Sequence, residues 1–509
     1  DTVLINIILG PPGTGKTTKL LNICQAKKEQ GISWDKIGFF SFSQKAAYEA
    51  RDRARDKFQA SRDELDNFRT LHSFAYRNLP IDDHNLFKKK NWKELSSMIG
   101  WDLNFDESED SIFTNTNHKF VNLINLSRLK NTELMEEWRN SDDRTMSWAR
   151  LEFLDDTINK FKKENDLFDY TDMIVHYTHD PHVKNFDVLF IDEAQDMPTI
   201  QFEMINKLIK NSKETYIAGD DDQAIFRWMG ADVDRFISLE GNVQVLDKSY
   251  RCPQKIFKLA NFIITKVKNR RVKDWSPKKE EGTVKRVTHL QHIDLSEGNW
   301  LLLGRTKKIR NEMIEAHLKS LGMWYGRGEH RPVSKSILNA IDAWNRLQND
   351  MTISYSDVQS IYNQIIAKGR LKRGAKTFTD EDKEKIYSLD TLKKDHGLLV
   401  DGAWYEVMNK ISDYDVAYIR RLIDMGEDLQ KEPRIKTSTI HQAKGGECDN
   451  VVVLTDVGKL VYKSYIKNPD DEHRVFYVAV TRAKHNLFIV EPQTQNYYSM
   501  YSDFGHEEI

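Results

Sequence analysis

A glycine-rich stretch near the N-terminus constrains the fold of this chain more than any other feature. Residues 10–17 read Gly-Pro-Pro-Gly-Thr-Gly-Lys-Thr. They follow an apolar run at 3–9 that predicts a buried strand, and they precede residues 18–24, whose apolar spacing predicts a helix. Small residues in such a loop let backbone N–H groups surround a polyphosphate at the positive end of a helix. The order of strand, loop and helix therefore predicts a nucleoside triphosphate site.

Two side chains of the loop carry the expected chemistry. Lys16 can reach the β- and γ-phosphates, and the Thr17 hydroxyl can ligate Mg²⁺. The alternative is a glycine-rich turn with a chance lysine. All eight positions and both flanking segments fit the phosphate-binding pattern, which argues against that alternative.

Adjacent carboxylates follow a second apolar run, at 186–191. Asp192 is expected to hold Mg²⁺ through water, and Glu193 to polarise the attacking water. Taken alone, the two residues could equally be ordinary exposed acids after a strand. The phosphate-binding loop earlier in the chain makes the catalytic interpretation the better one.

A further strand is predicted at 214–218, and Gln223 follows it. Because α/β sheets bind ligands at the carboxyl edge, Gln223 is well placed to sense a γ-phosphate. Phe226 and Trp228 lie two residues apart just beyond, and nucleic-acid bases stack on such aromatics with about 1–3 kcal/mol each. The alternative for both aromatics is a place in the hydrophobic core.

Strand-like and helix-like stretches alternate in four parts of the chain, whereas helical patterns without clear strands fill two others. A chain of 509 residues is expected to hold several domains. The alternation predicts parallel sheets covered on both faces, so the predicted fold class is α/β. The α/β parts lie at 1–79 and 165–246 for a first domain and at 247–332 and 434–509 for a second, with helical insertions at 80–164 and 333–433.

Composition narrows the possible partners and the compartment. The net charge is −2, so nucleic-acid binding has to use local patches. Cys24, Cys252 and Cys448 are too far apart to suggest a disulfide framework or a zinc site, which fits a reducing, cytoplasmic compartment. No apolar run approaches the length of a membrane span, and no basic segment precedes the first apolar run as in a signal peptide.

The motifs, in this order, resemble those of superfamily 1 helicases of the UvrD/Rep type. The acidic motif reads DEAQD, and the segment around Gln223 reads GDDDQAIFRWMG. Eight motifs in the correct order make coincidence negligible. They lie at 10–17 (motif I), 41–47 (Ia), 70–74 (Ib), 192–196 (II), 219–230 (III), 249–251 (IV), 439–447 (V) and 477–484 (VI).

The resemblance implies two RecA-like P-loop NTPase domains, each interrupted by a mainly helical insertion. By the same resemblance, Arg251 and Arg482 reach the γ-phosphate from the second domain and neutralise charge that develops in the transition state. Tyr250 stacks on the adenine, and Glu447 contacts the nucleotide sugar or couples it to DNA. The match to motif I adds the nucleotide-binding positions Gly10, Pro11, Gly13, Thr14, Gly15 and Thr18.

The resemblance also implies a track for single-stranded DNA. Its expected residues are Phe42, His72, Phe226, Trp228, Thr439 and His441. For His72 and His441 a purely structural hydrogen-bonding role is the alternative.

The expected function is an ATP- and Mg²⁺-dependent DNA helicase that moves along single-stranded DNA and acts at single/double-strand junctions, in replication or repair. The expected direction is 3′ to 5′. The Pro11–Pro12 pair is also similar to the 5′-to-3′ branch, but motifs III and VI count for more. Two alternatives remain: an ATPase, stimulated by single-stranded DNA, that displaces bound proteins, and a partner-binding switch without nucleic acid. The aromatic residues after Gln223 argue against the latter.

Overall fold

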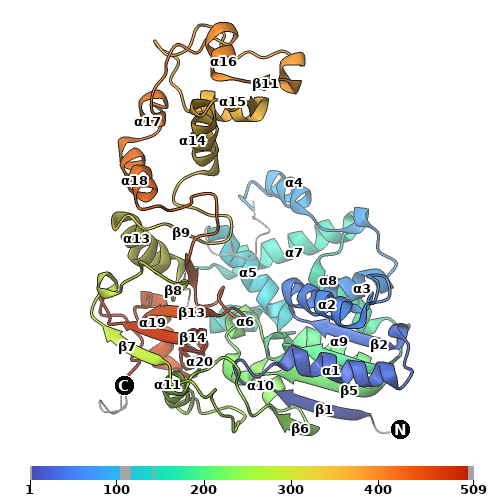
Figure 1. The fold of residues 1–509 in the computed structure, drawn as a ribbon. Coiled ribbons are helices and arrows are strands. Elements are labelled where there is room, and N and C mark those ends of the chain that lie inside the picture. The colour runs from blue at the N-terminus through green and yellow to red at the C-terminus, as the bar shows by residue number, and fades with distance from the viewer. Residues whose placement is uncertain (1–2, 104–115, 142, 144, 502–509) are drawn as a thin grey trace. The chain divides into compact units, whose positions relative to one another are not determined.

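The computed structural model describes residues 3–103, 116–141, 143 and 145–501. Contacts between residues divide the chain into two compact units. Figure 1 labels helices and strands of both units. The first unit consists of Asp1–Glu281 and Tyr465–Thr481, and the second of Gly282–Ser464 and Arg482–Ile509. Each unit is built around one sheet and is described here by itself.

The sheet of the first unit has six parallel strands in the order β3-β2-β4-β5-β1-β6. Leu9 pairs with Gly219 and Val245, and Ser41 pairs with Asp192, so the carboxyl ends of the strands meet at one edge. The strands are β1 (Leu4–Leu9), β2 (Ile37–Ser41), β3 (Phe68–Thr70), β4 (Phe186–Asp192), β5 (Ser212–Gly219) and β6 (Asn242–Val245).

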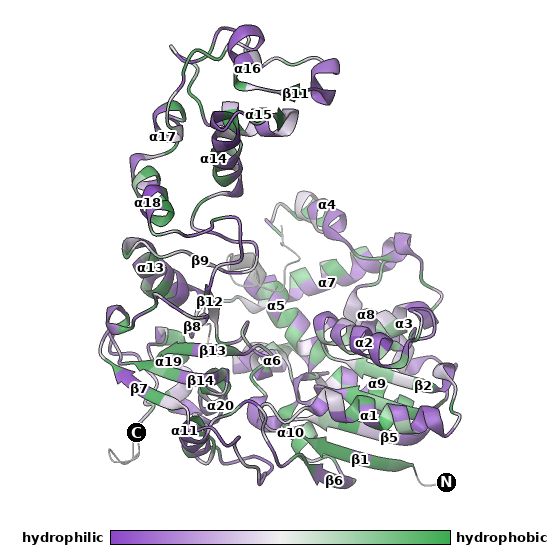
Figure 2. Ribbon diagram, in the orientation of Figure 1, coloured by the Kyte–Doolittle hydropathy of each residue, from purple (hydrophilic) through white to green (hydrophobic). Residues whose placement is uncertain are grey.

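Helices cover both faces of this sheet because successive residues of a strand point to opposite sides. Ile8 packs with Leu20 and Cys24 in one core, whereas its neighbour Ile7 packs with Phe74 in another. In Figure 2, β1 is hydrophobic and α1 mixes hydrophobic with hydrophilic residues. The helices of the two faces are α1 (Lys16–Glu29) and α2 (Gln44–Phe58) on one side, with α3 (Leu71–Asn78), α8 (Tyr170–His179) and α9 (Thr199–Lys210) on the other.

The insertion into the first unit is helical, as predicted. Its described residues contain no strand. Leu95, Phe120, Leu151 and Phe161 form part of a core of its own. The helices are α4 (Lys89–Ile99), α5 (Thr116–Leu129), α6 (Leu134–Asn140) and α7 (Trp148–Glu164).

Two further segments pack into the first unit. Helix α11 (Gln254–Ile264) contacts helix α20 (Asp470–Val480), and both belong to the unit that holds the glycine loop. The sequence assigns 247–281 and 465–481 to the second domain, whereas the contacts group them with the first sheet. The domain boundaries proposed from sequence stay a prediction. The short helix α10 (Val233–Ile237) completes this unit.

The second unit also has a sheet of six parallel strands, in the order β7-β14-β13-β8-β12-β9. Leu302, Ile314, Ile435 and Val452 belong to its core. The two parallel sheets confirm the predicted α/β class. The elements are β7 (Thr283–Val287), β8 (Trp300–Gly304), α12 (Lys307–Ile309), α13 (Ala316–Ser320), β9 (Tyr325–Gly326), β12 (Ile435–Thr439), β13 (Cys448–Leu454) and β14 (Ala483–Val490), with a π-helix at Arg310–Glu315. Helix α19 (Lys459–Lys467) begins in this unit, and its residues from 465 onward are grouped with the first unit.

The second insertion is mainly helical and has a core around the buried Trp344. Its indole Nε1 donates a hydrogen bond to the Gly402 carbonyl oxygen at 2.9 Å. The elements are α14 (Lys335–Gln348), β10 (Ile353–Ser354), α15 (Tyr355–Asn363), β11 (Ile386–Tyr387), α16 (Leu389–Asp395), α17 (Trp404–Val407) and α18 (Asp413–Asp424), with β10 and β11 antiparallel.

Candidate nucleotide and nucleic-acid site

The glycine loop connects the end of β1 to the start of α1. Gly13 and Gly15 have φ angles of 72° and 82°, a region that favours glycine. A Cβ atom on Gly10 would lie 1.8 Å from Cγ of Lys16, so only glycine lets the lysine side chain lie across the loop. The Thr14 hydroxyl donates to the Pro11 carbonyl oxygen at 2.7 Å and closes the turn. The local sequence thus accounts for the loop conformation.

The acidic motif lies next to this loop at the carboxyl edge of the sheet. Lys16 Nζ is 3.2 Å from Glu193 Oε1, and the Thr17 hydroxyl donates to Asp192 Oδ2 at 2.8 Å. Burial by itself lowers the pKa of Lys16, but Glu193, Asp192 and Asp220 outweigh it and the pKa is raised. Lys16 therefore carries its charge at neutral pH. Burial, together with the charge of Glu193, raises the pKa of Asp192 to about 6.

The same side chains fit a magnesium ion. Thr17 and Asp192 offer a hydroxyl and a carboxylate oxygen close together, and Mg²⁺ prefers hard oxygen ligands. A cation there would also offset the buried charge of Asp192. The pair is therefore suited to hold Mg²⁺ beside a nucleotide on the loop.

The backbone of Glu193 adopts a left-handed conformation, with φ 54° and ψ 38°. Such a conformation costs a non-glycine residue on the order of 1–3 kcal/mol and persists only where its surroundings hold it. Gln195 Nε2 donates to Glu193 Oε2 at 2.6 Å, while Lys16 contacts the other oxygen. The Glu193 carboxylate is therefore held on two sides.

Gln223 lies in the short 3-10 turn Asp221–Gln223 that follows β5, and its side-chain amide makes a hydrogen bond to the residue just before that turn. Its Nε2 donates to Asp220 Oδ2 at 2.7 Å. The Asp220 backbone N–H donates in turn to Gln195 Oε1 at 3.1 Å. Gln195 thus contacts both Glu193 and the segment that carries Gln223, so one buried amide connects the acidic motif to Gln223.

Tyr250 and Arg251 lie against the glycine loop within the first unit. The Ser249 hydroxyl donates to the Pro12 carbonyl oxygen, and the Tyr250 N–H donates to the Gly13 carbonyl oxygen, both at 2.8 Å. A Cβ atom on Gly13 would lie 2.4 Å from the Arg251 Cβ. The resemblance implies that Arg251 reaches the nucleotide from a second domain, whereas the contacts group Arg251 with the unit of the loop itself. Tyr250 is 72% exposed, which suits a stacking surface.

Four of the predicted DNA-track residues lie in the first unit: Phe42, His72, Phe226 and Trp228. The rings of Phe42 and Phe226 are stacked, with centroids 6.4 Å apart and an interplanar angle of 29°. Trp228 follows in the same loop and is 45% exposed, so it is not a core residue. His72, in α3, lies edge-on to Tyr170, and burial lowers its pKa to about 4. His72 is therefore neutral at physiological pH.

Comparison with protein families assigns both halves of the chain. Residues 4–244 match the UvrD/REP helicase N-terminal domain, and residues 326–494 match the UvrD-like helicase C-terminal domain. The chain belongs to the UvrD/Rep family of helicases. This confirms the resemblance seen in the motifs, and the protein is an ATP-hydrolysing DNA helicase.

Two relatives of this UvrD/Rep-type helicase match nearly its whole length, and a third matches a shorter part. It is 23% identical to a probable DNA helicase II homolog of Mycoplasma genitalium, over 95% of this chain and 82% of the relative. It is likewise 23% identical to a probable DNA helicase of Mycoplasma pneumoniae, over 98% of this chain and 82% of the relative. The ATP-dependent DNA helicase PcrA of Bacillus subtilis is 29% identical, over 23% of this chain and 16% of the relative.

The remaining predicted residues of the helicase lie in the second unit. Arg482 is buried, and its Nη1 donates to the Gly446 carbonyl oxygen at 3.0 Å. Glu447 lies 3.9 Å from the Lys484 ammonium. The Thr439 hydroxyl accepts a hydrogen bond from the Gln442 N–H at 3.3 Å, which leaves His441 in the turn that follows β12. Motif V and the last three residues of motif VI, at 482–484, are therefore held together within this unit.

Sequence reasoning missed several residues that shape the site. Gln195 lies inside the DEAQD motif, and that position is a sequence signal that could have indicated a role in the site. Lys273 and Arg270, which contact the acidic residues before Gln223, carry no sequence signal. Of the three cysteines, Cys24 and Cys252 are buried and Cys448 is partly buried. Among the described residues, no helix is both long and apolar enough to cross a bilayer.

Proposed function

We propose that this helicase hydrolyses ATP with Mg²⁺ on the Lys16–Thr17–Asp192–Glu193 arrangement and uses the energy to move along single-stranded DNA. The observation that carries the proposal is the pair of contacts between the glycine loop and the acidic motif: Lys16 to Glu193 at 3.2 Å and Thr17 to Asp192 at 2.8 Å. They bring a phosphate-binding cation, a metal ligand and a base together at one sheet edge.

The other residues take the roles that the helicase motifs suggest. Tyr250 stacks on the adenine, and Gln223, Arg251 and Arg482 respond to the γ-phosphate. Glu447 contacts the nucleotide sugar or couples it to DNA. Gly10, Pro11, Gly13, Thr14, Gly15 and Thr18 complete the nucleotide contacts. Hydrolysis alternates two states with different nucleotide contacts, which is what a motor cycle requires.

The DNA track uses the stacked pair Phe42–Phe226 together with the exposed Trp228, His72, Thr439 and His441. Stacking suits single strands because every base has an aromatic face. The neutral state of His72 supports a hydrogen-bonding role and not a charge contact with phosphate. Movement runs 3′ to 5′ and leads to strand separation at single/double-strand junctions.

The ATPase part is tested with Lys16→Ala. This variant is expected to lose DNA-stimulated ATP hydrolysis, since the phosphate-binding cation is gone. Lys19→Ala, on the same helix but past the loop, is the matched control and should hydrolyse ATP normally. Near-normal turnover in Lys16→Ala would overturn the assignment.

The direction is tested with two partial duplexes that differ only in whether the single-stranded tail is 3′ or 5′. We expect unwinding of the 3′-tailed substrate only. Unwinding of the 5′-tailed substrate alone would reverse the proposed direction. Displacement of a protein block from single strands, with no unwinding of either substrate, would identify the enzyme as a protein-displacing ATPase.

A further inference from the structure

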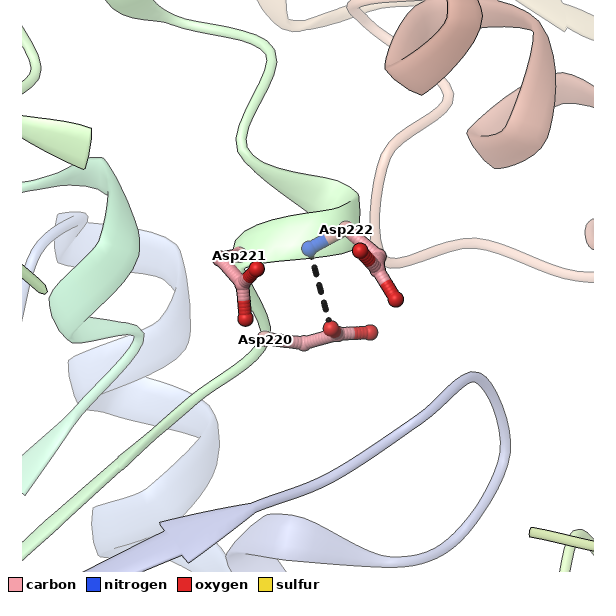
Figure 3. A group of neighbouring side chains, drawn as sticks. All are labelled: Asp220, Asp221 and Asp222. Atoms are coloured by element: carbon pink, nitrogen blue, oxygen red, sulfur yellow. Dashed lines mark hydrogen bonds between the residues drawn. The ribbon is translucent and has the colours of Figure 1, made fainter. Parts of the chain in front are cut away.

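Three consecutive carboxylates are buried just before Gln223. Asp220, Asp221 and Asp222 are at most 1% exposed, and one oxygen of each lies within 4.8 Å of the others. Figure 3 shows them around the short turn that follows β5, with the Asp222 N–H hydrogen-bonded to Asp220. Buried carboxylates at this spacing repel one another and need a cation. Such a group of oxygen ligands could hold a metal ion.

A lysine side chain lies among these three carboxylates. Lys273 Nζ lies 2.7 Å from Asp221, 3.1 Å from Asp222 and 3.4 Å from Asp220. The same ammonium donates to the Arg271 carbonyl oxygen at 2.6 Å. Burial alone lowers the pKa of Lys273, but the three carboxylates outweigh burial and raise it. The ammonium is therefore charged, and it lies within reach of all three acids.

The residues around Lys273 add further contacts to the acidic turn. Arg270 forms a two-point contact with Asp222, from Nε at 2.8 Å and Nη2 at 2.6 Å. The Arg271 N–H donates to Asp221 Oδ2 at 2.8 Å. Residues 270–273 thus contact every carboxylate of the turn from a segment about fifty positions later in the chain.

Asp220 is shared between Lys273 and Gln223, one of the residues of the proposed ATPase site. Asp220 contacts Lys273 through Oδ1 and accepts the Gln223 amide through Oδ2, at 2.7 Å. Through its backbone N–H, Asp220 also donates to Gln195, which holds Glu193. A change in the charge beside Asp220 therefore affects Asp220, which orients Gln223. It also affects Gln195, which orients Glu193.

We propose that Lys273 is a built-in cation that replaces a divalent metal in the Asp220–Asp222 cluster and acts as a positioning residue for Gln223. The acidic turn has no resident metal, and its shape depends on the Lys273 ammonium. The part of this proposal that concerns Gln223 rests on the proposed ATPase function, whereas the part that concerns the occupant of the cluster does not.

The occupant is tested by Tb³⁺ titration of the full chain without nucleotide. Lys273→Met removes the ammonium at similar volume, and we expect this variant to bind one Tb³⁺ more than the natural protein. Adding Asp221→Asn to Lys273→Met should remove the extra ion. Equal Tb³⁺ stoichiometry in folded Lys273→Met and natural protein would overturn the proposal.

A second variant tests the occupant if Lys273→Met does not fold. In that case Tb³⁺ stoichiometry is measured for Asp221→Asn in the otherwise natural protein. Unchanged Tb³⁺ stoichiometry supports the ammonium as occupant, and loss of one Tb³⁺ means that the intact cluster binds metal and overturns the proposal. Lys162→Met reports the general effect of losing a buried lysine, because Lys162 also bridges two acids, Asp169 and Asp172.

Positioning of Gln223 is read from the kinetics. In Lys273→Met we expect kcat for DNA-stimulated ATP hydrolysis to fall about tenfold with little change in KM, and Mn²⁺ to restore part of kcat as it fills the vacated place. A merely structural lysine gives no metal rescue, so absence of rescue in a variant that binds the extra Tb³⁺ would overturn the positioning role. Absence of ATPase activity in the natural protein would instead refute the proposed function and leave the Tb³⁺ result standing.

Discussion

The Gln195 amide donates a 2.6 Å hydrogen bond to the carboxylate of Glu193, the proposed base of ATP hydrolysis. Gln195 is fully buried, and its oxygen accepts the Asp220 N–H. A Cβ atom on Gly219 would lie 2.5 Å from that oxygen, so glycine there allows the close approach. Gln195 therefore orients Glu193 and ties it to the turn that carries Gln223.

Replacing Gln195 should slow hydrolysis more than it weakens nucleotide binding. In Gln195→Leu the Glu193 carboxylate loses an orienting donor, and we expect kcat to fall about ten- to hundredfold with a small change in KM. Steady-state ATPase kinetics check this. Gln201→Leu, which alters a glutamine buried in α9, is the control. Equal loss in both variants would mean that Gln195 is only a packing residue.

Gly13→Ala should disrupt the nucleotide site. Its φ of 72° strains any other residue by about 1–3 kcal/mol, and the added Cβ meets the Arg251 Cβ at 2.4 Å. We expect at least about a tenfold loss of affinity for a fluorescent ATP analogue. Gly31→Ala is the control, because Gly31 has a similar φ of 87° but no atom lies within 4 Å of its added Cβ. It therefore shows the effect of backbone strain without a steric clash. Unchanged affinity in Gly13→Ala would contradict the described loop.

Trp228→Ala should uncouple hydrolysis from movement. Loss of one stacking surface, worth about 1–3 kcal/mol, is expected to weaken single-strand binding about tenfold and stop translocation, while ATP hydrolysis without DNA stays the same. Binding by fluorescence anisotropy and displacement of a bound end-block measure the two effects. Tyr414→Ala removes a comparably exposed aromatic from the second unit. Normal translocation by Trp228→Ala would remove the residue from the track.

Arg482→Ala should still bind nucleotide and hydrolyse it at least about a hundredfold more slowly, because a cation that offsets transition-state charge is lost. Equilibrium binding and single-turnover hydrolysis separate the two steps. Arg434→Ala is the matched control, since Arg434 also donates to a backbone carbonyl oxygen in the second unit, that of Gly298 at 2.7 Å. Fast hydrolysis in Arg482→Ala would place the cation elsewhere.

His72 should make the stability of its unit depend on pH. Burial lowers its pKa from 6.5 to about 4, with Asp169 acting in the opposite direction. The unfolded chain therefore binds a proton between pH 6.5 and 4 that the folded chain does not, and stability is lost as pH falls through this range. The free energy of unfolding lost through His72 is at most about 3 kcal/mol.

Urea unfolding of the natural protein and His72→Gln at pH 7.5, 6.0 and 5.0 measures this dependence. The stability advantage of the natural protein should shrink as pH falls. His473, whose pKa is also lowered to about 4, is common to both proteins and cancels from the comparison. A difference that stays constant with pH would show that His72 titrates normally.

The amino-acid sequence by itself determined the features that depend on neighbouring residues. The positive φ angles of Gly13 and Gly15, and the strand and helix that flank the loop, follow from local conformational preferences. Asp192 and Glu193 follow the apolar run that forms β4, so their place at the sheet edge could also be predicted. The alternation of strands and helices was enough to predict two parallel sheets with helical insertions.

Only the tertiary structure decided which distant segments lie together. It placed Arg251 against the glycine loop, Lys273 among three buried carboxylates, and the Gln195 amide between Glu193 and Asp220. It also gave His72 a surrounding that keeps it neutral. These properties depend on burial and on pairs of residues far apart in the chain, and local preference and periodicity carry no information about either.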